Sequence, residues 1–569
     1  MNNRILLLPL FTLVAGSLLS GCGGGSSGSD DGTATISGTV YAAAVSGAQV
    51  NLKSVDGTVL AGPVITNDNG EYTLQVEKGR LGEALLLEAN GGSYIDEATG
   101  LSVDAGTLAA YVAAGKLAPG TKVSLTPGTT IVKKLITAHG KTPQVAEETF
   151  KNAFGFAPDS SVTPRSKDGE EAQLRAALRA AAFSQLTMDL GLRAAQQFDL
   201  LSAIAADLAD GAADGQADGR PITIGDSGKS LPIDIQSRFS RSMTRFFASA
   251  NNTTGLTADK IGTLPEGNIV LTDSYKIERA AMTGPMEGKS ICTLTITNLA
   301  DETPATGLAI SLMPIMNMAM HEHSTPVDGC VEQTDPAGTY RCTVYYLMAS
   351  KMMNGMSMGF WDVKVSIGGM DGEEAHFYPS VMMAMGGDTA KAVLQGQTDK
   401  IAGMGGMSMN QEGGMAGDHQ MQMSAMTMGD GTMPENRKYF LFKDGITGMT
   451  GNHTFNLFIA TKENMMSYPA VSIGTELTDE NGNKWTVNSM TVEVSTDRTS
   501  WIAATDNGNG HWSATGITGL TDGTQGTLYV KLVVNGEQKT DDGLAPDGVA
   551  DYAEFKVTPG ASSMGGMEM

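Results

Sequence analysis

Short runs in which apolar and polar residues alternate recur along most of this sequence, and they constrain its fold more than any other feature. They include TATISGTV near the start, ICTLTITNL and TYRCTVYYLM in the middle, and HTFNLFIATK and TLYVKLVVNG near the end. A period of two residues is typical of half-buried antiparallel strands. Because 569 residues are too many for one hydrophobic core, we predict a multidomain, mainly β protein.

The N-terminal segment has the features of an export signal. Arg4 precedes the apolar run Ile5–Leu19, and Leu19-Ser20-Gly21-Cys22 follows. This segment resembles a bacterial lipoprotein signal, which implies cleavage after residue 21 and lipidation of Cys22. Residues 22–32 then form a Gly/Ser linker that suits a membrane tether. The residue after Cys22 is Gly and not Asp, which implies anchoring in the outer membrane, on its periplasmic or surface face. The alternative is an ordinary signal peptide with a chance cysteine.

The first region after the linker, residues 33–98, carries strand-like alternation and turn residues. The order SGTV, GAQVNL and TNDNGEYTL resembles the carboxypeptidase-regulatory-like, transthyretin-type β-sandwich. The resemblance implies a spacer or stalk module. Residues 100–260 differ, because apolar residues at helical spacing run through residues 170–208. We therefore expect one α-helical domain there. DGAADGQADG, which follows that helical pattern, places aspartates every fourth residue, whereas an EF-hand loop needs ligands every second residue, so we interpret it as a connector.

A second strand-rich region spans residues 277–369. Its order of Met313-Pro314, Gly338 with Tyr340, and Gly359 with Trp361 resembles the YtkA-like family of exported immunoglobulin-like domains. Relatives of that family are often linked to copper or to oxidase assembly, so the resemblance implies metal handling. Residues 437–560 return to strands and are expected to form a third sandwich, followed by a Met-rich tail at 561–569. The predicted fold is thus a set of immunoglobulin- or transthyretin-like β-sandwiches with one α-helical domain and a disordered Met-rich loop.

Three cysteines remain after Cys22, namely Cys292, Cys330 and Cys342. Export makes a disulfide plausible, but an odd number leaves one thiol over unless all three face a soft metal. Cys292 and Cys342 both alternate with apolar neighbours and are expected to face inward. A bridge between sheets through Cys292 and Cys342, and a bridge between Cys330 and Cys342, both remain open.

Methionine is the most unevenly distributed residue. Only Met1, Met188 and Met243 precede residue 282, so 31 of the 34 methionines follow. The densest run, LMPIMNMAMHEHSTP, holds Met313, Met316, Met318, Met320, His321 and His323. Thioethers are soft ligands that select Cu(I), and imidazole accepts both copper oxidation states. We therefore predict a copper site here, with Cu(I) favoured over Cu(II).

The geometry of this run depends on whether the chain bends. In an unbroken strand Met316, Met318 and Met320 share one face, and His321 and His323 lie on the other. One site that uses both sets needs a bend near Met320. Otherwise two sites are expected, a thioether one for Cu(I) and a histidine one for Cu(II). Core packing is the competing role for Met313 at the strand end.

A second methionine cluster follows in KMMNGMSMGFW. Asn354-Gly355 predicts a two-residue hairpin turn. In that register Met353 faces Met356 and Met358 lies on the same face, while Met352 points away. Three thioethers at a hairpin tip would suit trigonal Cu(I).

Residues 380–436 are a Met-rich, low-complexity segment with few β-branched or aromatic residues. It contains His419, Met421 and Met423, which we assign to low-affinity copper capture. A methionine oxidant sink is the alternative.

The remaining features narrow the class of function. A net charge of −24 argues against nucleic acid as a partner, because phosphate binding needs basic surface. The sequence shows no nucleophile elbow, P-loop, dinucleotide fingerprint or H-E-x-x-H motif, so we expect no enzyme. The sequence predicts an exported lipoprotein that binds copper for sequestration, delivery or tolerance, with another exported copper protein as a partner. The alternative is a cell-surface stalk or adhesin-like protein whose methionines act as an oxidant sink or an adaptable binding surface.

Overall fold

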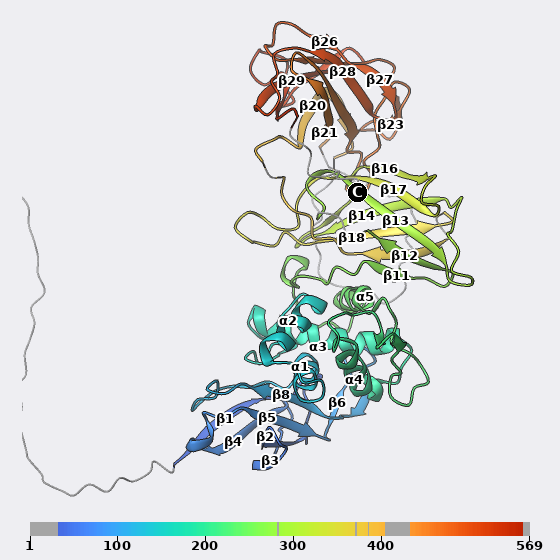
Figure 1. The fold of residues 1–569 in the computed structure, drawn as a ribbon. Helices are drawn as coiled ribbons and strands as arrows, with labels where there is room; N and C mark the ends of the chain where they lie inside the picture. Colours follow the sequence, from blue (N-terminus) through green and yellow to red (C-terminus); the bar gives the residue numbers. More distant parts are fainter. Residues whose placement is uncertain (1–31, 281–283, 370–371, 385, 404–432, 561–569) are drawn as a thin grey trace, which may run out of the picture.

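The computed structural model describes residues 32–280, 284–369, 372–384, 386–403 and 433–560. Its strands form several separate antiparallel sheets, and one block of helices lies between the first and second strand-rich parts (Figure 1). The prediction of a multidomain, mainly β protein with one helical region is therefore confirmed. Three predicted segments lie outside the described residues. They are the signal segment with Cys22, residues 404–432 with His419, Met421 and Met423, and the tail 561–569.

The N-terminal sandwich consists of a two-stranded and a four-stranded sheet, ordered β1-β4 and β3-β2-β5-β8. Its strands are β1 Thr33–Thr39, β2 Gln49–Ser54, β3 Val59–Ile65, β4 Glu71–Glu77, β5 Leu85–Asn90 and β8 Leu108–Val112. A small pair, β6 Ser93–Ile95 and β7 Ser102–Asp104, lies beside them. Strand β4 alternates exposed and buried residues throughout. Because β8 pairs with β5, this sandwich continues past its predicted boundary at residue 98.

Five helices follow the sandwich, and the first of them packs against its strand β8. They are α1 Pro127–Thr137, α2 Pro143–Phe154, α3 Glu171–Asp189, α4 Gln197–Asp207 and α5 Ile235–Ala248. Helix α1 starts at a capping box in which Thr126 and Thr129 bond reciprocally, with Pro127 at its first position. Buried residues of sandwich and helices form one continuous hydrophobic cluster. No helix in the described ranges combines the length and the apolar character that crossing a bilayer requires.

The central sandwich places a five-stranded sheet against a four-stranded one. The first sheet, ordered β11-β12-β13-β17-β16, contains β11 Ile269–Leu271, β12 Tyr275–Arg279, β13 Gly288–Asn298, β17 Thr339–Tyr346 and β16 Val327–Gln333. The second, ordered β15-β14-β18-β19, contains β15 Glu322–His323, β14 Ile310–Asn317, β18 Phe360–Ile367 and β19 Glu373–Phe377. Inward residues of both sheets, among them Leu294, Tyr340 and Trp361, form its core.

The C-terminal sandwich also pairs two sheets around its own core. One, ordered β20-β21-β22-β28-β27, has β20 Lys391–Ile401, β21 Glu435–Met449, β22 Asn452–Thr461, β28 His511–Ile517 and β27 Thr505–Gly508. The other has β26 Ile502–Ala503, β25 Met490–Ser495, β29 Gly526–Val534, β30 Glu537–Lys539 and β31 Ala553–Val557. A separate hairpin joins β23 Glu476–Thr478 to β24 Lys484–Thr486.

Strand β20 corrects the prediction that residues 380–436 form one disordered loop. It pairs with β21 from Lys391 to Ile401 and buries Leu394 in the C-terminal core. Its alternating segment AVLQGQ carries enough apolar side chains to add an edge strand, although methionine-rich sequence flanks it on both sides.

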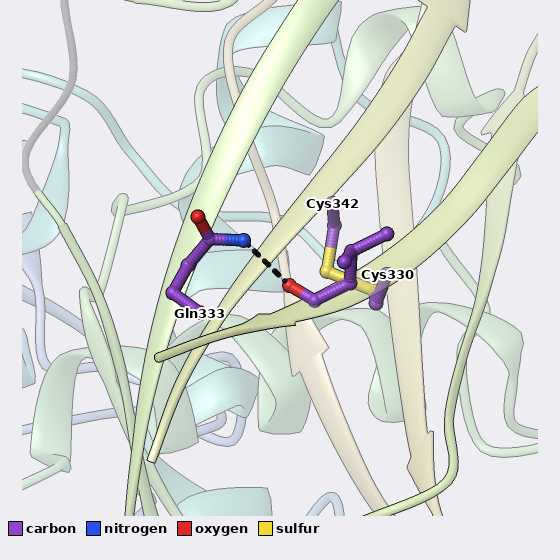
Figure 2. The surroundings of a disulfide bond; sticks show 4 residues. Cys330, Gln333 and Cys342 are labelled. Carbon is purple, nitrogen blue, oxygen red and sulfur yellow. Dashed lines mark hydrogen bonds between the residues drawn. A yellow bond between two sulfur atoms is a disulfide. The ribbon is translucent and has the colours of Figure 1, made fainter. Parts of the chain in front are cut away.

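The three cysteines lie side by side on neighbouring strands of one sheet. Cys342 on β17 is opposite Cys292 on β13 and opposite Cys330 on β16. The disulfide joins Cys330 and Cys342 with an S–S distance of 2.00 Å, and Cys292 is free. Figure 2 shows this bond beside Gln333, whose side-chain amide donates to the Val331 carbonyl. Because all three strands belong to one sheet, an inter-sheet bridge through Cys292 is excluded here.

Candidate metal centre

Strand β14 places the first part of the Met/His run in the central core. Leu312, Pro314 and Met316 are buried in alternation, whereas Met313 and Ile315 lie on the opposite, half-buried face. Met316 is fully buried and lies opposite Trp361 on β18. Met313 is therefore separated from Met316 by the sheet, and these two methionines do not share a site.

A tight turn follows β14 and reverses the chain. The backbone N–H of Met318 donates to the carbonyl of His321 at 3.1 Å, and β15 then pairs antiparallel with β14. In this register Met316 is directly opposite His323. Directly opposite residues on paired strands point to the same face, so the turn brings one methionine and one histidine together. This is the bend that a single site with both ligand types requires.

The turn also separates the other predicted residues from that pair. Met320 is 72 % exposed, and His321 is exposed with its ring centroid 6.3 Å from that of His323. Met318 is half-buried and packs against the central core. Of the six residues predicted in this run, Met316, Met318 and His323 thus reach the interior, and Met320 and His321 face solvent.

His323 is the most informative residue of the cluster. Its side chain is buried, with the residue 6 % exposed, and Nδ1 lies 2.7 Å from the Ser324 carbonyl oxygen. A carbonyl only accepts hydrogen bonds, so Nδ1 carries the proton and Nε2 of the neutral ring carries a lone pair. Burial lowers the pKa of His323 below its usual value, which keeps the ring neutral at pH 7.

The Nε2 lone pair of His323 points at a sulfur atom. Met348 Sδ lies 3.2 Å from Nε2. The Trp361 ring meets the His323 ring edge-on with centroids 5.5 Å apart, and Trp361 Nε1 donates to the Met348 carbonyl at 3.2 Å. Trp361 therefore fixes both partners of this contact.

Met348 is the site residue that sequence reasoning missed. It ends the run TYRCTVYYLM, where a terminal methionine is indistinguishable from an ordinary core residue. The sequence does hold one signal for Met348 as a site residue: it lies only four residues before Met352, where the second methionine cluster starts.

The second cluster forms a hairpin, but its register differs from the predicted one. The N–H of Met352 donates to the Met356 carbonyl at 2.8 Å, and the N–H of Gly355 donates to the Met352 carbonyl at 2.9 Å. Gly355 has φ +81°, so the turn is a three-residue loop with a left-handed glycine. Met353 is consequently 91 % exposed at the tip and faces no methionine. The expected pairing of Met353 with Met356 is wrong, and Met352 takes its place.

At His323, methionine sulfur is the further side-chain donor that the described residues offer. Within the described residues, no three His, Cys, Asp or Glu side chains converge in a way that could hold a metal ion. Three other histidines bind carboxylates instead. His376 binds Asp362, His453 binds Asp522, and His511 binds both Asp328 and Asp444. His323 differs from them because its free nitrogen faces a thioether.

Comparisons with known proteins add little to this geometry. No protein-family profile matches the chain, and no curated protein matches it. Among solved structures, the chain is similar to the Escherichia coli adhesin FdeC, with 14 % identity, a TM-score of 0.14 and coverage of 51 % of this chain and 66 % of the adhesin chain. It is also similar to domains 5–6 of the S-layer protein SbsC, with 11 % identity, a TM-score of 0.13 and coverage of 48 % and 98 %. TM-scores this low assign neither fold nor function.

Proposed function

We propose that this protein binds copper as Cu(I) outside the cytoplasm, for sequestration, delivery or tolerance. The observation that carries the proposal is the 3.2 Å contact between His323 Nε2 and Met348 Sδ. Both atoms are hydrogen-bond acceptors in the neutral, Nδ1-protonated ring, so no hydrogen lies between them. A cation of soft character would satisfy both lone pairs at once.

The donor set fits Cu(I) better than harder ions. A thioether and a neutral imidazole bring no negative charge, and methionine resists the oxidation that turns exported thiols into disulfides. His323 and Met348 would hold the ion, and Met316, buried opposite His323, is the nearest further thioether in the register. Copper would be the cargo, another exported copper protein is the proposed partner, and the proposal includes no catalytic step.

A competition titration tests the proposal. Purified protein is titrated with Cu(I) against a chromophoric chelator under reducing, anaerobic conditions. We expect the wild-type protein to hold copper against the chelator, and His323→Asn and Met348→Leu to weaken its tightest site. Met490→Leu, at a buried methionine of the C-terminal core, is the matched control and should bind as the wild type does. Wild-type affinity in both site variants would refute the assignment.

A second function is favoured by the way the domains are joined. The N-terminal sandwich and helices share one core, and the central and C-terminal sandwiches are linked through buried aromatic residues and ion pairs, which gives an elongated stack (Figure 1). A cell-surface stalk or adhesin-like role would use such a rod. In that role the methionines would serve only as packing or as an oxidant sink. Replacing Met316, Met318, Met348 and Met358 together by Leu would then leave partner binding unchanged and remove no copper affinity.

The proposed location is the outer membrane, through a lipid on Cys22. Its support is the lipoprotein-like segment that ends at Cys22 and the linker behind it. Growth with a labelled fatty acid should label the wild-type protein and should leave a Cys22→Ser variant unlabelled. A labelled variant would refute the anchor.

A further inference from the structure

The hairpin that follows Met348 places further thioethers on a defined face. Lys351 pairs with Ser357, and the N–H of Met358 donates to the Ser350 carbonyl at 2.9 Å. Met352 pairs with Met356 by the bond described above. Because side chains alternate along paired strands, Met352, Met356 and Met358 share one face, and Lys351 and Ser357 lie on the other.

These three methionines, here named the hairpin thioethers, differ in burial along the hairpin. Met352 is 45 % exposed and Met356 is 57 % exposed. Met358 is half-buried and packs against the central core, as does Met348. The hairpin thioethers therefore run from partly exposed positions to the central core, against which Met348, the contact of His323, also packs.

The hairpin is held in place at its base. Lys351 Nζ donates to Thr263 Oγ1 at 3.0 Å, and the N–H of Ser350 donates to the Val381 carbonyl at 2.8 Å. Trp361, which follows the hairpin on β18, donates to Met348. The face with the hairpin thioethers is thus fixed relative to His323.

We infer that the hairpin thioethers are the entry route by which Cu(I) reaches His323 and Met348. This inference rests on the proposed copper function and names how its site is loaded. Along the hairpin each step is a ligand exchange in which one Cu–S bond forms as another breaks. In the last step the bonds to Met348 sulfur and His323 nitrogen form as the bonds to the hairpin thioethers break, and the ion stays Cu(I) throughout. The hairpin thioethers are neutral soft donors, the ligand type that selects Cu(I).

Two other exposed methionines provide the comparison. Met353 at the tip and Met320 in the β14–β15 turn are both more exposed than Met352 or Met356. Met353 lies in the loop outside the paired face, and the residues next to Met320 in its turn are exposed. Exposure alone would make these two the better entry points, whereas an ordered face would favour Met352 and Met356.

The test separates rate from affinity. Cu(I) bound to bathocuproine disulfonate is mixed with purified full-length protein in an anaerobic stopped-flow instrument, and loss of the chelate absorbance is followed. We expect the Met352→Leu/Met356→Leu double variant to load about tenfold more slowly, equivalent to ~1.4 kcal/mol in the barrier, with an equilibrium affinity equal to that of the wild type. Met353→Leu and Met320→Leu are the matched controls and should load at the wild-type rate. Leucine keeps the apolar volume, so unchanged circular dichroism melting curves will show intact folding.

Other outcomes overturn the inference in distinguishable ways. A double variant that loads at the wild-type rate refutes the route but leaves the copper site standing. A double variant with lower affinity makes Met352 and Met356 ligands and not a route. Slower loading in Met320→Leu, with no change in the double variant, moves entry to the β14–β15 turn. A wild-type protein that takes no copper from the chelator refutes the route and the proposed function together.

Discussion

The Tyr345 ring of the central sandwich stacks on the Phe458 ring of the C-terminal sandwich, with centroids 4.0 Å apart and planes within 3° of parallel. Tyr345 is fully buried, and its hydroxyl donates to Asp444 Oδ1 at 2.8 Å. Phe442 and Ala460 complete this small apolar cluster. Tyr345 thus contributes to both the apolar and the polar part of the joint between the two sandwiches.

Replacing Tyr345 should weaken that joint in two separable steps. Tyr345→Ala is expected to lower the free energy of unfolding by ~3–5 kcal/mol, because a large buried ring is lost. Tyr345→Phe keeps the stack and removes only the bond to a charged acceptor, so ~1.5–3 kcal/mol is expected. Calorimetry of the full chain measures both values. Equal losses in the two variants would contradict the role assigned to the stack.

The same joint should depend on pH through His511. Its Nδ1 lies 3.4 Å from Asp444 and its Nε2 lies 3.1 Å from Asp328, and Lys289 also binds Asp444. The hydrogen bond to Asp444 and, next, the one to Asp328 raise the pKa of His511 above 6.5. The folded state therefore binds the His511 proton more tightly than the unfolded state does.

The contribution of His511 to stability is fully present below its unfolded pKa of about 6.5 and is lost as the pH rises through the higher folded pKa. Melting temperatures measured from pH 6 to pH 9 should fall in that window for the wild type. The fall should be smaller in His511→Gln, which carries no titrating ring. Identical pH profiles for both proteins would exclude His511 as the cause.

Arg437 should be a major stability determinant of the C-terminal sandwich. Its fully buried guanidinium donates to Asp399 at 2.8 Å, to Glu463, and to the Thr478 carbonyl at 2.6 Å. Arg437→Met leaves the two carboxylates without this partner, and a loss of ~3–5 kcal/mol in unfolding free energy is expected. Arg498→Met is the control, because Arg498 is an exposed residue above the Tyr529 ring, and less than ~1 kcal/mol is expected there. Urea titration checks both.

Cys292 should resist alkylation in the folded protein. Burial raises the pKa of its thiol to about 11, and the thiolate is the reactive form. Iodoacetamide at pH 8 followed by peptide mass spectrometry should leave Cys292 unmodified before unfolding and label it after unfolding. Labelling of the folded protein at the rate of a free cysteine would contradict this. Carbamidomethylation of Cys330 or Cys342 without reductant would contradict the disulfide.

Much of the fold was predictable because alternation is a local signal. The segments that became β14, β17 and β22 read as strands from their own residues, and the helical region was identified by its spacing in the same way. Strand β20 was not predicted, because it has few apolar residues and lies between two methionine-rich segments. The first sandwich was ended too early because β8 belongs to it only through pairing with β5, a long-range contact that no local pattern reveals.

The candidate metal centre was predictable only in part. A bend near Met320 was recognised as the condition for one mixed site, and the turn is there. The predicted register of the second hairpin was wrong by one residue. The loop has three residues, so Met352 and not Met353 pairs with Met356, because a shift of one position moves a side chain to the other face. Met348 required tertiary information, because His323 lies on β15 of one sheet and Met348 follows β17 of the other sheet, so their contact forms only when the two sheets pack together.

The register of β20 and β21 has a consequence for the methionine-rich segment between them. Lys400 pairs with Asn436 and Ile401 pairs with Glu435, so the two strand ends that flank residues 404–432 lie next to each other. Closing so short a gap needs only a few residues, and loop-closure entropy changes slowly with loop length. We therefore expect that residues 404–432 can be deleted without unfolding the C-terminal sandwich. A version of the protein in which a short Gly/Asn turn replaces it should keep its sandwiches and would lose eight of the 34 methionines. The metal capacity of the folded scaffold could then be measured by itself.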